Sequence, residues 1–355
     1  MIGSDGRNAK AELLGPSPAR KEMQQRLSRT AAEVGKQLAI RYGHELGSVQ
    51  YIPAMALVGR LQLGELTKDT AHRADVEKIV APFVEGKKEA LGEKPGGVVI
   101  AGHLVFGELA VLTKDAKYRE MVRKAADRGL DSGGKPLEVI PGHSEMSDAV
   151  FMHCPLLARA GALTKDRRYF EACAKNLAFM RKLCARQDGL YRHSPLDEAA
   201  WGRGNGFPAL GLALSLSDIP EDEAVREPIL KAYREQMAAV LKHQDATGAW
   251  HQVIDVPGSY RELTATCMIT FAMARGVRHG WLDREKYDPA IRRAWGAIRA
   301  RVATDGTLVD VCEGTGKQKD LRTYLDRKAI LGADPRGGAM ALLAAVEIAE
   351  WEKRK

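Results

Sequence analysis

The sequence predicts an all-α protein in which six helical hairpins close into a ring, the (α/α)6 barrel or six-hairpin toroid. Three observations support this fold class. Helix-forming residues dominate, and aromatic residues make up only 6% of the 355-residue chain, which favours helix over sheet. A four-residue motif repeats at the ends of apolar segments in the first half of the chain. Glycine-containing turns recur between the apolar segments of the second half.

The repeated motif is Leu-Thr-Lys-Asp, which occurs at residues 66–69, 112–115 and 163–166. Each copy follows an apolar segment that we expect to be a helix, and the second and third copies run on into a further helix. Successive copies are 46 and 51 residues apart. A period of this length is typical of stacked helix pairs, each of which buries its apolar face only against its neighbours.

Weaker apolar segments continue this series until it reaches six. They lie at residues 210–218, 271–283 and 339–351. A second series of turns separates the later pairs, and its members are Asp188-Gly189, Thr247-Gly248 and Asp305-Gly306. We expect each of these dipeptides to end a helix and to allow a short strand to begin after it.

Six hairpins can also form an open α-solenoid, which would bind a peptide along its concave face. The periods are long and irregular, and the connecting segments are rich in Gly, His, Trp and Arg, whereas solenoid turns need only be short and polar. These features favour a closed ring. We expect residues 1–25 to form an N-terminal tail and residues 26–355 to form a single catalytic domain.

The composition narrows the classes of partner and cofactor. A formal net charge of +8 suits an anionic ligand. Nucleic acid is not expected as a partner, because no run of five or more like charges occurs. The five cysteines are an odd number and form no CxxC pair, so we expect no disulfide framework, no metal and no cofactor. A homo-oligomer is compatible with the sequence.

No apolar segment is long enough to span a membrane, and the N-terminus has no apolar core of the kind found in signal peptides. We therefore expect no membrane partner and a cytoplasmic location. A periplasmic or secreted location is expected instead if a leader has been removed.

The first segment that can carry chemistry is 141–152, with the sequence PGHSEMSDAVFM. Glu145 and Asp148 are three residues apart, which places both carboxylates on one face if the segment is helical. The alternative is that a serine caps the helix and the acids merely occupy its first turn. Asp148 leads directly into an apolar run. A carboxyl group at the edge of a core resists ionisation, so we expect Asp148 to act as a proton donor near neutral pH.

The second segment combines 188–193 with 201–207, which reads WGRGNGF. Three alternating glycines are expected to prevent a helix here and to bring the backbone close to a ligand. Arg203 offers a planar fork for a carboxylate, and Trp201 offers a stacking surface for a sugar ring. His193 and Asn205 add hydrogen-bonding groups. The alternative is a glycine-rich connector with an aromatic plug.

Together these segments resemble the unsaturated rhamnogalacturonyl and glucuronyl hydrolases of glycoside hydrolase families 105 and 88. The resemblance runs from about residue 54 to the C-terminus. The matching residues are 147–152, 189–193, 201–206, 250–255 and Glu262. The resemblance implies an (α/α)6 barrel that removes a terminal uronic acid with a C4=C5 double bond from a lyase-generated oligosaccharide.

The resemblance also implies roles for individual residues. Asp148 matches the family's proton donor, which protonates C4 of the enol ether so that water can add to the ring. The expected substrate-binding residues are His143, Glu145, His193, Trp201, Arg203, Asn205, Phe207, Trp250 and Glu262.

The chain departs from the family pattern in the second helix pair. The family usually has a second aspartate at the start of that pair's inner helix, where this chain reads GGVVIAGH at 96–103. Met146 and Phe207 also stand where Trp is common. We expect His143, Glu145 or His103 to take over the role of the missing acid.

Two other functions stay open at this point. One is a conventional glycosidase on the same fold, such as a glucuronidase, that uses Asp148 together with Glu145 or Glu262. The other is a non-catalytic, carbohydrate-binding ring of helices.

Overall fold

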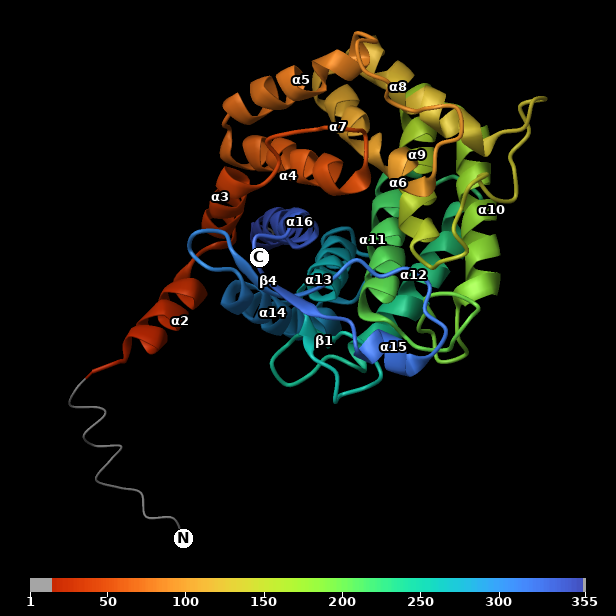
Figure 1. Ribbon diagram of the computed structural model, residues 1–355. Coiled ribbons are helices and arrows are strands. Elements are labelled where there is room, and N and C mark those ends of the chain that lie inside the picture. The colour runs from red at the N-terminus through yellow and green to blue at the C-terminus, as the bar shows by residue number, and fades with distance from the viewer. Residues whose placement is uncertain (1–14, 354–355) are drawn as a thin grey trace.

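The computed structural model describes residues 15–353. Twelve segments of this part of the chain form the ring, and they alternate between an inner and an outer layer (Figure 1). The inner helices are α4 (Tyr51–Thr67), α6 (Gly97–Gly102) followed directly by α7 (Leu104–Thr113), α9 (Ala149–Thr164), α11 (Gly202–Asp218), α13 (Leu263–Arg278) and α16 (Pro335–Glu352). The outer helices are α3 (Ala31–Arg41), α5 (Ala71–Val84), α8 (Ala116–Ala126), α10 (Arg167–Cys184), α12 (Arg226–Leu241) and α14 (Arg284–Arg301).

The inner helices contact one another in chain order, and α16 returns to pack against α4. The ring is therefore closed, which confirms the predicted (α/α)6 barrel. The sixth pair joins the two ends of the chain, because α16 packs against α3.

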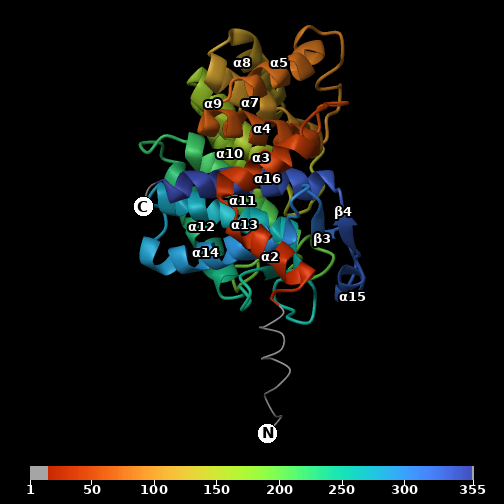
Figure 2. The same cartoon turned by 90° about the vertical axis from the view of Figure 1, so that its left-hand side faces the viewer.

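Helix α2 (Pro18–Ser28) lies outside the ring and contacts α14 (Figures 1 and 2). None of its residues is buried, although Arg26 donates a hydrogen bond to the carbonyl oxygen of Ala300 at 3.1 Å. Part of the predicted tail is therefore helical, and residues 1–14 lie outside the described residues. The division into a tail at 1–25 and one domain at 26–355 stays a prediction.

The core of the ring is formed by helices that are apolar on almost every side. All but two residues of α13, Arg275 and Arg278, are buried, which is typical of a helix surrounded by protein. Both arginines contact the buried carboxylate of Glu347 on α16 at 2.5 Å. This ion pair neutralises the one buried charge of α16 and links two neighbouring inner helices. No helix among the described residues is long and apolar enough to cross a membrane.

The three Leu-Thr-Lys-Asp motifs lie on one rim of the ring, because each joins the end of an inner helix to the start of an outer one. Their lysines, Lys68, Lys114 and Lys165, adopt left-handed conformations with φ of 58°, 60° and 60°. The aspartates of the second and third copies then cap the next helix through backbone N–H groups of Lys117 and Arg168. The three motifs are therefore equivalent turns, as the stacked helix pairs expected from their period require.

The opposite rim carries the longer connections that lead into the inner helices. Its regular elements are η1 (Asp127–Gly129), β1 (Trp250–His251), β2 (Arg261–Glu262), β3 (Leu308–Cys312), α15 (Leu321–Leu325) and β4 (Ala329–Gly332). Strands β1 and β2 pair antiparallel, as do β3 and β4. Figure 2 shows β3, α15 and β4 gathered at this end of the barrel.

The second series of turns lies on this rim as well. Gly189, Gly248 and Gly306 have φ of 86°, 93° and 79°, which only glycine adopts without strain. Each turn is followed by strand-like pairing: Tyr191 bridges Ala185, Trp250 begins β1, and Leu308 begins β3. The predicted turn-to-strand transitions are confirmed.

Candidate active site

Asp148 lies in a cavity of about 310 Å³ at the N-terminal ends of α6 and α9. Three glycines, Gly96, Gly97 and Gly142, form part of the wall and leave room for a ligand. The polar side chains of the wall come from Tyr51, His143, Ser144, Asp148 and His153.

Asp148 occupies the position immediately before α9, and the residue is 8% exposed. Its Oδ1 atom is 3.3 Å from Nε2 of His193. The two atoms are not aligned as a hydrogen bond, and Oδ1 has no other partner within the described part of the chain. The carboxyl group therefore faces the cavity without an internal hydrogen bond at this oxygen.

His193 is fixed from two sides. Its Nδ1 is 2.9 Å from the hydroxyl oxygen of Tyr324, and its ring lies 4.4 Å from that of Trp201, centroid to centroid. Burial raises the pKa of Tyr324 to about 12, so the phenol stays protonated. Sequence reasoning missed Tyr324, because α15 belongs to neither repeat and its contact with His193 spans 131 residues.

Arg203 and Trp201, for which the sequence predicted a carboxylate-binding fork and a stacking surface, are both buried. Arg203 donates hydrogen bonds to the carbonyl oxygens of Cys312 at 2.7 Å and Glu313 at 2.8 Å. Its guanidinium also covers the Trp201 ring, 4.5 Å from the centroid, and Trp201 is only 1% exposed. In this structure Arg203 therefore anchors the end of β3, and Trp201 offers no open face to a sugar. Recognition of a carboxylate by Arg203 stays a prediction.

The prediction that the glycines of 201–207 prevent a helix is wrong, because α11 begins at Gly202. A Cβ atom at Gly202 would lie 2.6 Å from the carbonyl oxygen of His251, and one at Gly206 would lie 2.7 Å from Cε of Met268. The glycines therefore allow neighbouring segments to approach α11 closely. This close packing outweighs the low helix propensity of glycine, which costs about 1 kcal/mol per residue relative to alanine.

Glu145 does not share a helical face with Asp148, because α9 starts only at Ala149. Glu145 has a left-handed backbone with φ of 53°, and its side chain is 56% exposed and 2.9 Å from Nζ of Lys317. The hydrogen bond from Lys317 lowers the pKa of Glu145. An exposed carboxylate that pairs with a lysine is poorly suited to act as the acid partner of Asp148.

Two histidines were also expected to replace the missing acid. His143 lines the cavity and contacts the Phe179 ring edge-on at 5.2 Å between centroids, and partial burial lowers its pKa. His103 is buried, with Nδ1 2.8 Å from the carbonyl oxygen of Val99, and it does not belong to the wall of this cavity. Of the three candidates, only His143 lines the same cavity as Asp148.

The remaining predicted substrate-binding residues are buried supports. Asn205 forms hydrogen bonds of 2.8 Å with both N–H and C=O of Tyr191. Phe207 stacks on Phe151 at 5.5 Å between centroids. Trp250 donates from Nε1 to the carbonyl oxygen of Val240 at 2.7 Å. These contacts hold together the segments around the site, and none of the three side chains lines the cavity.

Glu262 likewise has a structural place, because it caps α13. Its Oε2 accepts from the backbone N–H of Ala265 at 2.6 Å, and its Oε1 accepts from that of Cys312 at 2.9 Å. The residue is fully buried. Glu262 thus joins β3 to the start of α13 and is not an acid facing Asp148.

Sequence reasoning also missed two residues of the cavity wall, Tyr51 and His153. Burial raises the pKa of Tyr51 to about 12, so its hydroxyl is a neutral donor and acceptor. His153 follows Asp148 on α9 and is fully buried. Because His153 lies in the apolar run of that helix, the sequence pattern did not indicate that it lines a cavity.

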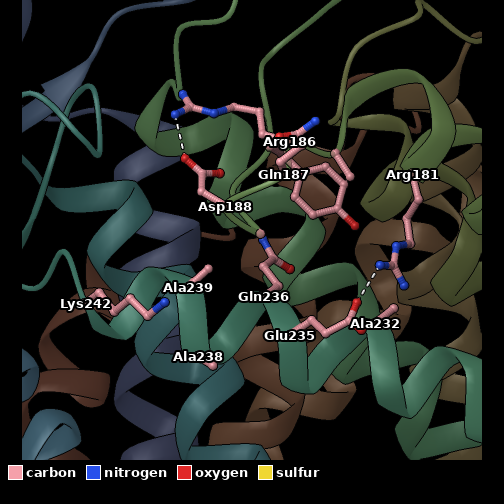
Figure 3. A pocket seen from close by; sticks show the side chains of 13 residues that line it. Arg181, Arg186, Gln187, Asp188, Ala232, Glu235, Gln236, Ala238, Ala239 and Lys242 are labelled. Carbon is pink, nitrogen blue, oxygen red and sulfur yellow. Dashed lines mark hydrogen bonds and ion pairs between the residues drawn. The ribbon is translucent and has the colours of Figure 1, made fainter.

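A larger hollow of about 500 Å³ lies on the outer wall, between α10 and α12. Figure 3 shows its ion pairs, Arg181 with Glu235 and Arg186 with Asp188, each at 2.6 Å. None of the described residues that line it is a predicted site residue. We therefore place the candidate active site in the smaller cavity with Asp148. Within residues 15–353, no cluster of three or more His, Cys, Asp or Glu side chains is arranged to hold a metal ion.

Comparisons with known proteins identify relatives of the chain. A 110-residue stretch is 37% identical to the unsaturated 3S-rhamnoglycuronyl hydrolase of Formosa agariphila and covers 30% of this chain and 29% of that protein. The hydrolase of the same name from an Alteromonas species is 27% identical over 219 residues, 58% of this chain and 51% of that protein. The chain thus spans about half the length, or less, of these curated relatives.

The fold and the family follow from two further matches. The solved structure of a family 105 glycoside hydrolase from C. acetobutylicum has the same fold, with a TM-score of 0.78 at 21% identity over 92% of this chain and 100% of that one. The model of Glycosyl Hydrolase Family 88 matches residues 21–351. The chain therefore belongs to Glycosyl Hydrolase Family 88.

Proposed function

We propose that this protein is a hydrolase that removes a terminal 4,5-unsaturated uronic acid from an acidic oligosaccharide, with Asp148 as the general acid. The observation that carries the proposal is that Asp148 is the only carboxyl group among the described residues that line its cavity. Hydration of an enol ether needs one proton donor, whereas ordinary glycoside hydrolysis uses two carboxyl groups that flank the bond. The names of the two unsaturated glycuronyl hydrolases among the relatives support the same substrate class.

The proposed reaction consumes one water molecule. The Asp148 carboxyl donates its proton to C4 of the unsaturated ring, and the positive charge that develops at C5 is shared with the ring oxygen. The Asp148 carboxylate then orients a water molecule, which adds to C5 and returns a proton to the carboxylate. The resulting hemiketal opens, and the bond at C1 breaks to release the next sugar. His193 lies beside this carboxyl group, with Nε2 at 3.3 Å from Oδ1.

A conventional glycosidase would need a second acid near Asp148, and neither candidate is suitable. Glu145 is exposed and paired with Lys317. Both oxygens of Glu262 accept hydrogen bonds inside the protein. The positions of these two acids therefore favour the single-acid mechanism.

The proposal is tested by following the ultraviolet absorbance of the conjugated C4=C5 double bond while the protein acts on lyase-digested uronate polymers. Loss of absorbance together with release of the next sugar is expected, because hydration removes the double bond. Release of sugar at constant absorbance would contradict the proposal and indicate a conventional glycosidase. Binding without release would indicate a carbohydrate-binding protein.

A further inference from the structure

Tyr324 contacts His193 from a segment that is distant in the sequence. The residue lies on α15, the short helix between β3 and β4, and it is 1% exposed. Its hydroxyl oxygen is 2.9 Å from Nδ1 of His193, and the two rings meet edge-on at 5.7 Å between centroids. Tyr324 is not one of the described residues that line the cavity of Asp148. Direct binding of a substrate therefore does not explain its contact with His193.

The position of Tyr324 is fixed by its backbone. Its carbonyl oxygen accepts a hydrogen bond of 2.6 Å from Nε2 of Gln252, which is fully buried. The first turn of α15 is capped by Asp320, whose Oδ1 accepts from the backbone N–H of Thr323 at 2.8 Å. The phenol is therefore held beside His193 by contacts in which His193 takes no part.

The other partners of the phenol determine the direction of its hydrogen bond to His193. The hydroxyl oxygen of Tyr324 accepts from the backbone N–H of Gln318 at 3.3 Å. Burial raises the pKa of Tyr324 to about 12, and the hydrogen bonds from the Gln318 N–H and the Ser194 hydroxyl oppose this rise. Within residues 15–353 no carbonyl or carboxylate oxygen accepts from the phenol, so its proton is directed to Nδ1 of His193. A neutral imidazole carries one hydrogen, which is then on Nε2.

Nε2 of His193 faces the carboxyl group of Asp148. Nε2 and Oδ1 lie 3.3 Å apart, both atoms are buried, and neither has a hydrogen-bond partner within the described residues. The tautomer of the imidazole decides in which direction a proton can pass between them. An unprotonated Nε2 would accept the acid proton of Asp148 and compete for it with a substrate, whereas an Nε2–H group can only donate to the carboxyl group.

We propose that Tyr324 is a positioning residue that keeps His193 in the Nε2–H tautomer, so that the imidazole cannot take the acid proton of Asp148. This inference rests on the proposed function, in which that proton is transferred to C4 of the unsaturated ring. Tyr324 acts through His193 and does not touch the substrate. The proposal gives α15 a part in the reaction, although none of its residues lines the cavity that the structure describes.

The tautomer is measured by ¹⁵N NMR of the wild-type protein without ligand, at about pH 8.5, where an unperturbed imidazole is neutral. The nitrogen that carries the hydrogen and the one that does not have well-separated ¹⁵N shifts. In His193, Nε2 is expected to carry the hydrogen. In Tyr324→Phe, which removes only the hydroxyl group, the Nδ1–H tautomer should become detectable. A wild-type His193 that carries its hydrogen on Nδ1 would overturn the proposal.

The loss of the C4=C5 absorbance then measures the effect on the reaction. Tyr324→Phe is expected to lower kcat about tenfold, the effect of one lost hydrogen bond, and to leave KM within about twofold, because the phenol does not touch the substrate. The matched control is Tyr233→Phe, which removes another buried phenol hydroxyl, bonded to the carbonyl oxygen of Ala272 at 2.7 Å. This control should lower the melting temperature and leave kcat unchanged.

A double-mutant cycle tests whether the effect passes through His193. In the His193→Leu protein, Tyr324→Phe should have no further effect on kcat, because two residues that act through one contact are not additive. A tenfold fall that persists in this background would overturn the proposal, as would an unchanged kcat or failure to fold in Tyr324→Phe alone. If His193→Leu does not fold, the tautomer found in Tyr324→Phe decides instead.

Failure of the proposed function gives a different pattern. The wild type then leaves the double bond of lyase-digested uronate polymers intact, while the NMR spectra still report the tautomer of His193 with and without the Tyr324 hydroxyl.

Discussion

Replacing Asp148 by Asn separates its chemical role from its structural one. Asn keeps the shape of the side chain, which makes no capping hydrogen bond to α9, but it cannot donate the proton. No other carboxyl group among the described residues lines the cavity, so none is placed to replace it. We therefore expect kcat to fall at least about 100-fold, which raises the barrier by about 2.7 kcal/mol.

The stability of this variant should change little. Oδ1 of Asp148 makes no hydrogen bond within the described residues, so the substitution removes no internal hydrogen bond at this atom. We expect the free energy of unfolding to change by less than about 1 kcal/mol, the contribution of one hydrogen bond. Urea unfolding measures the stability, and the loss of ultraviolet absorbance by the double bond measures kcat.

Glu145→Gln is the matched control, because Glu145 lies in the same loop but is exposed and paired only with Lys317. Its activity should stay within about twofold of the wild type, since exposed ion pairs contribute little. The assignment of Asp148 as the general acid is refuted if Glu145→Gln is inactive while Asp148→Asn keeps most of its activity. A conventional glycosidase based on Glu145 would then be the better assignment.

Three further predictions concern stability, each measured by urea unfolding. Arg203→Lys should cost about 1.5–3 kcal/mol, because a lysine cannot span two carbonyl oxygens; an unchanged midpoint would mean that these bonds contribute nothing. Gly202→Ala should cost about 1–3 kcal/mol through its clash with backbone. Gly296→Ala in α14 should instead gain about 0.4–1 kcal/mol, because an added Cβ there would meet no described atom within 4 Å beyond its chain neighbours and the adjacent backbone of its own helix; equal effects would contradict the packing argument. His103 has its pKa lowered to about 4, against about 6.5 when unfolded. Below pH 6.5 only the unfolded chain is protonated at His103, so stability should fall toward pH 4 by up to about 3 kcal/mol. The His103→Leu variant should not show this decrease in the free energy of unfolding between pH 6.5 and pH 4.

The fold could be predicted from the sequence because its signals are local and repeated. Each Leu-Thr-Lys-Asp motif encodes the same event, a left-handed lysine that ends an inner helix, and the structure repeats it at Lys68, Lys114 and Lys165. The Asp-Gly and Thr-Gly turns act in the same way on the other rim. Closure of the ring was harder to predict, since α16 meets α3 and α4 only after the whole chain has turned.

The candidate site was predicted less completely, because its contacts join distant segments. Asp148 could be found from its place at a loop-to-helix boundary. The left-handed backbone of Glu145 is not encoded by a glycine, so the sequence suggested a helical face that does not exist. The glycines that begin α11 were misread for the opposite reason: propensity disfavours a helix there, but packing against His251 and Met268 requires glycine.

The residues of the candidate site differ in how many of their hydrogen-bonding groups are already used within the protein. Two residues that the family resemblance marks as substrate-binding already use their hydrogen bonds to fix loops: Arg203 holds the end of β3, and Asn205 holds Tyr191. His193 pairs with Tyr324 through Nδ1, but its Nε2 makes no hydrogen bond within the described residues and lies 3.3 Å from Oδ1 of Asp148. Buried groups with satisfied hydrogen bonds have little reason to exchange them for a ligand. Among the described residues of the cavity wall, Asp148 retains a carboxylate oxygen without a hydrogen-bond partner. A carboxyl oxygen that lines the cavity and makes no internal hydrogen bond is therefore, more than residue type, the criterion by which we assign proton transfer to Asp148.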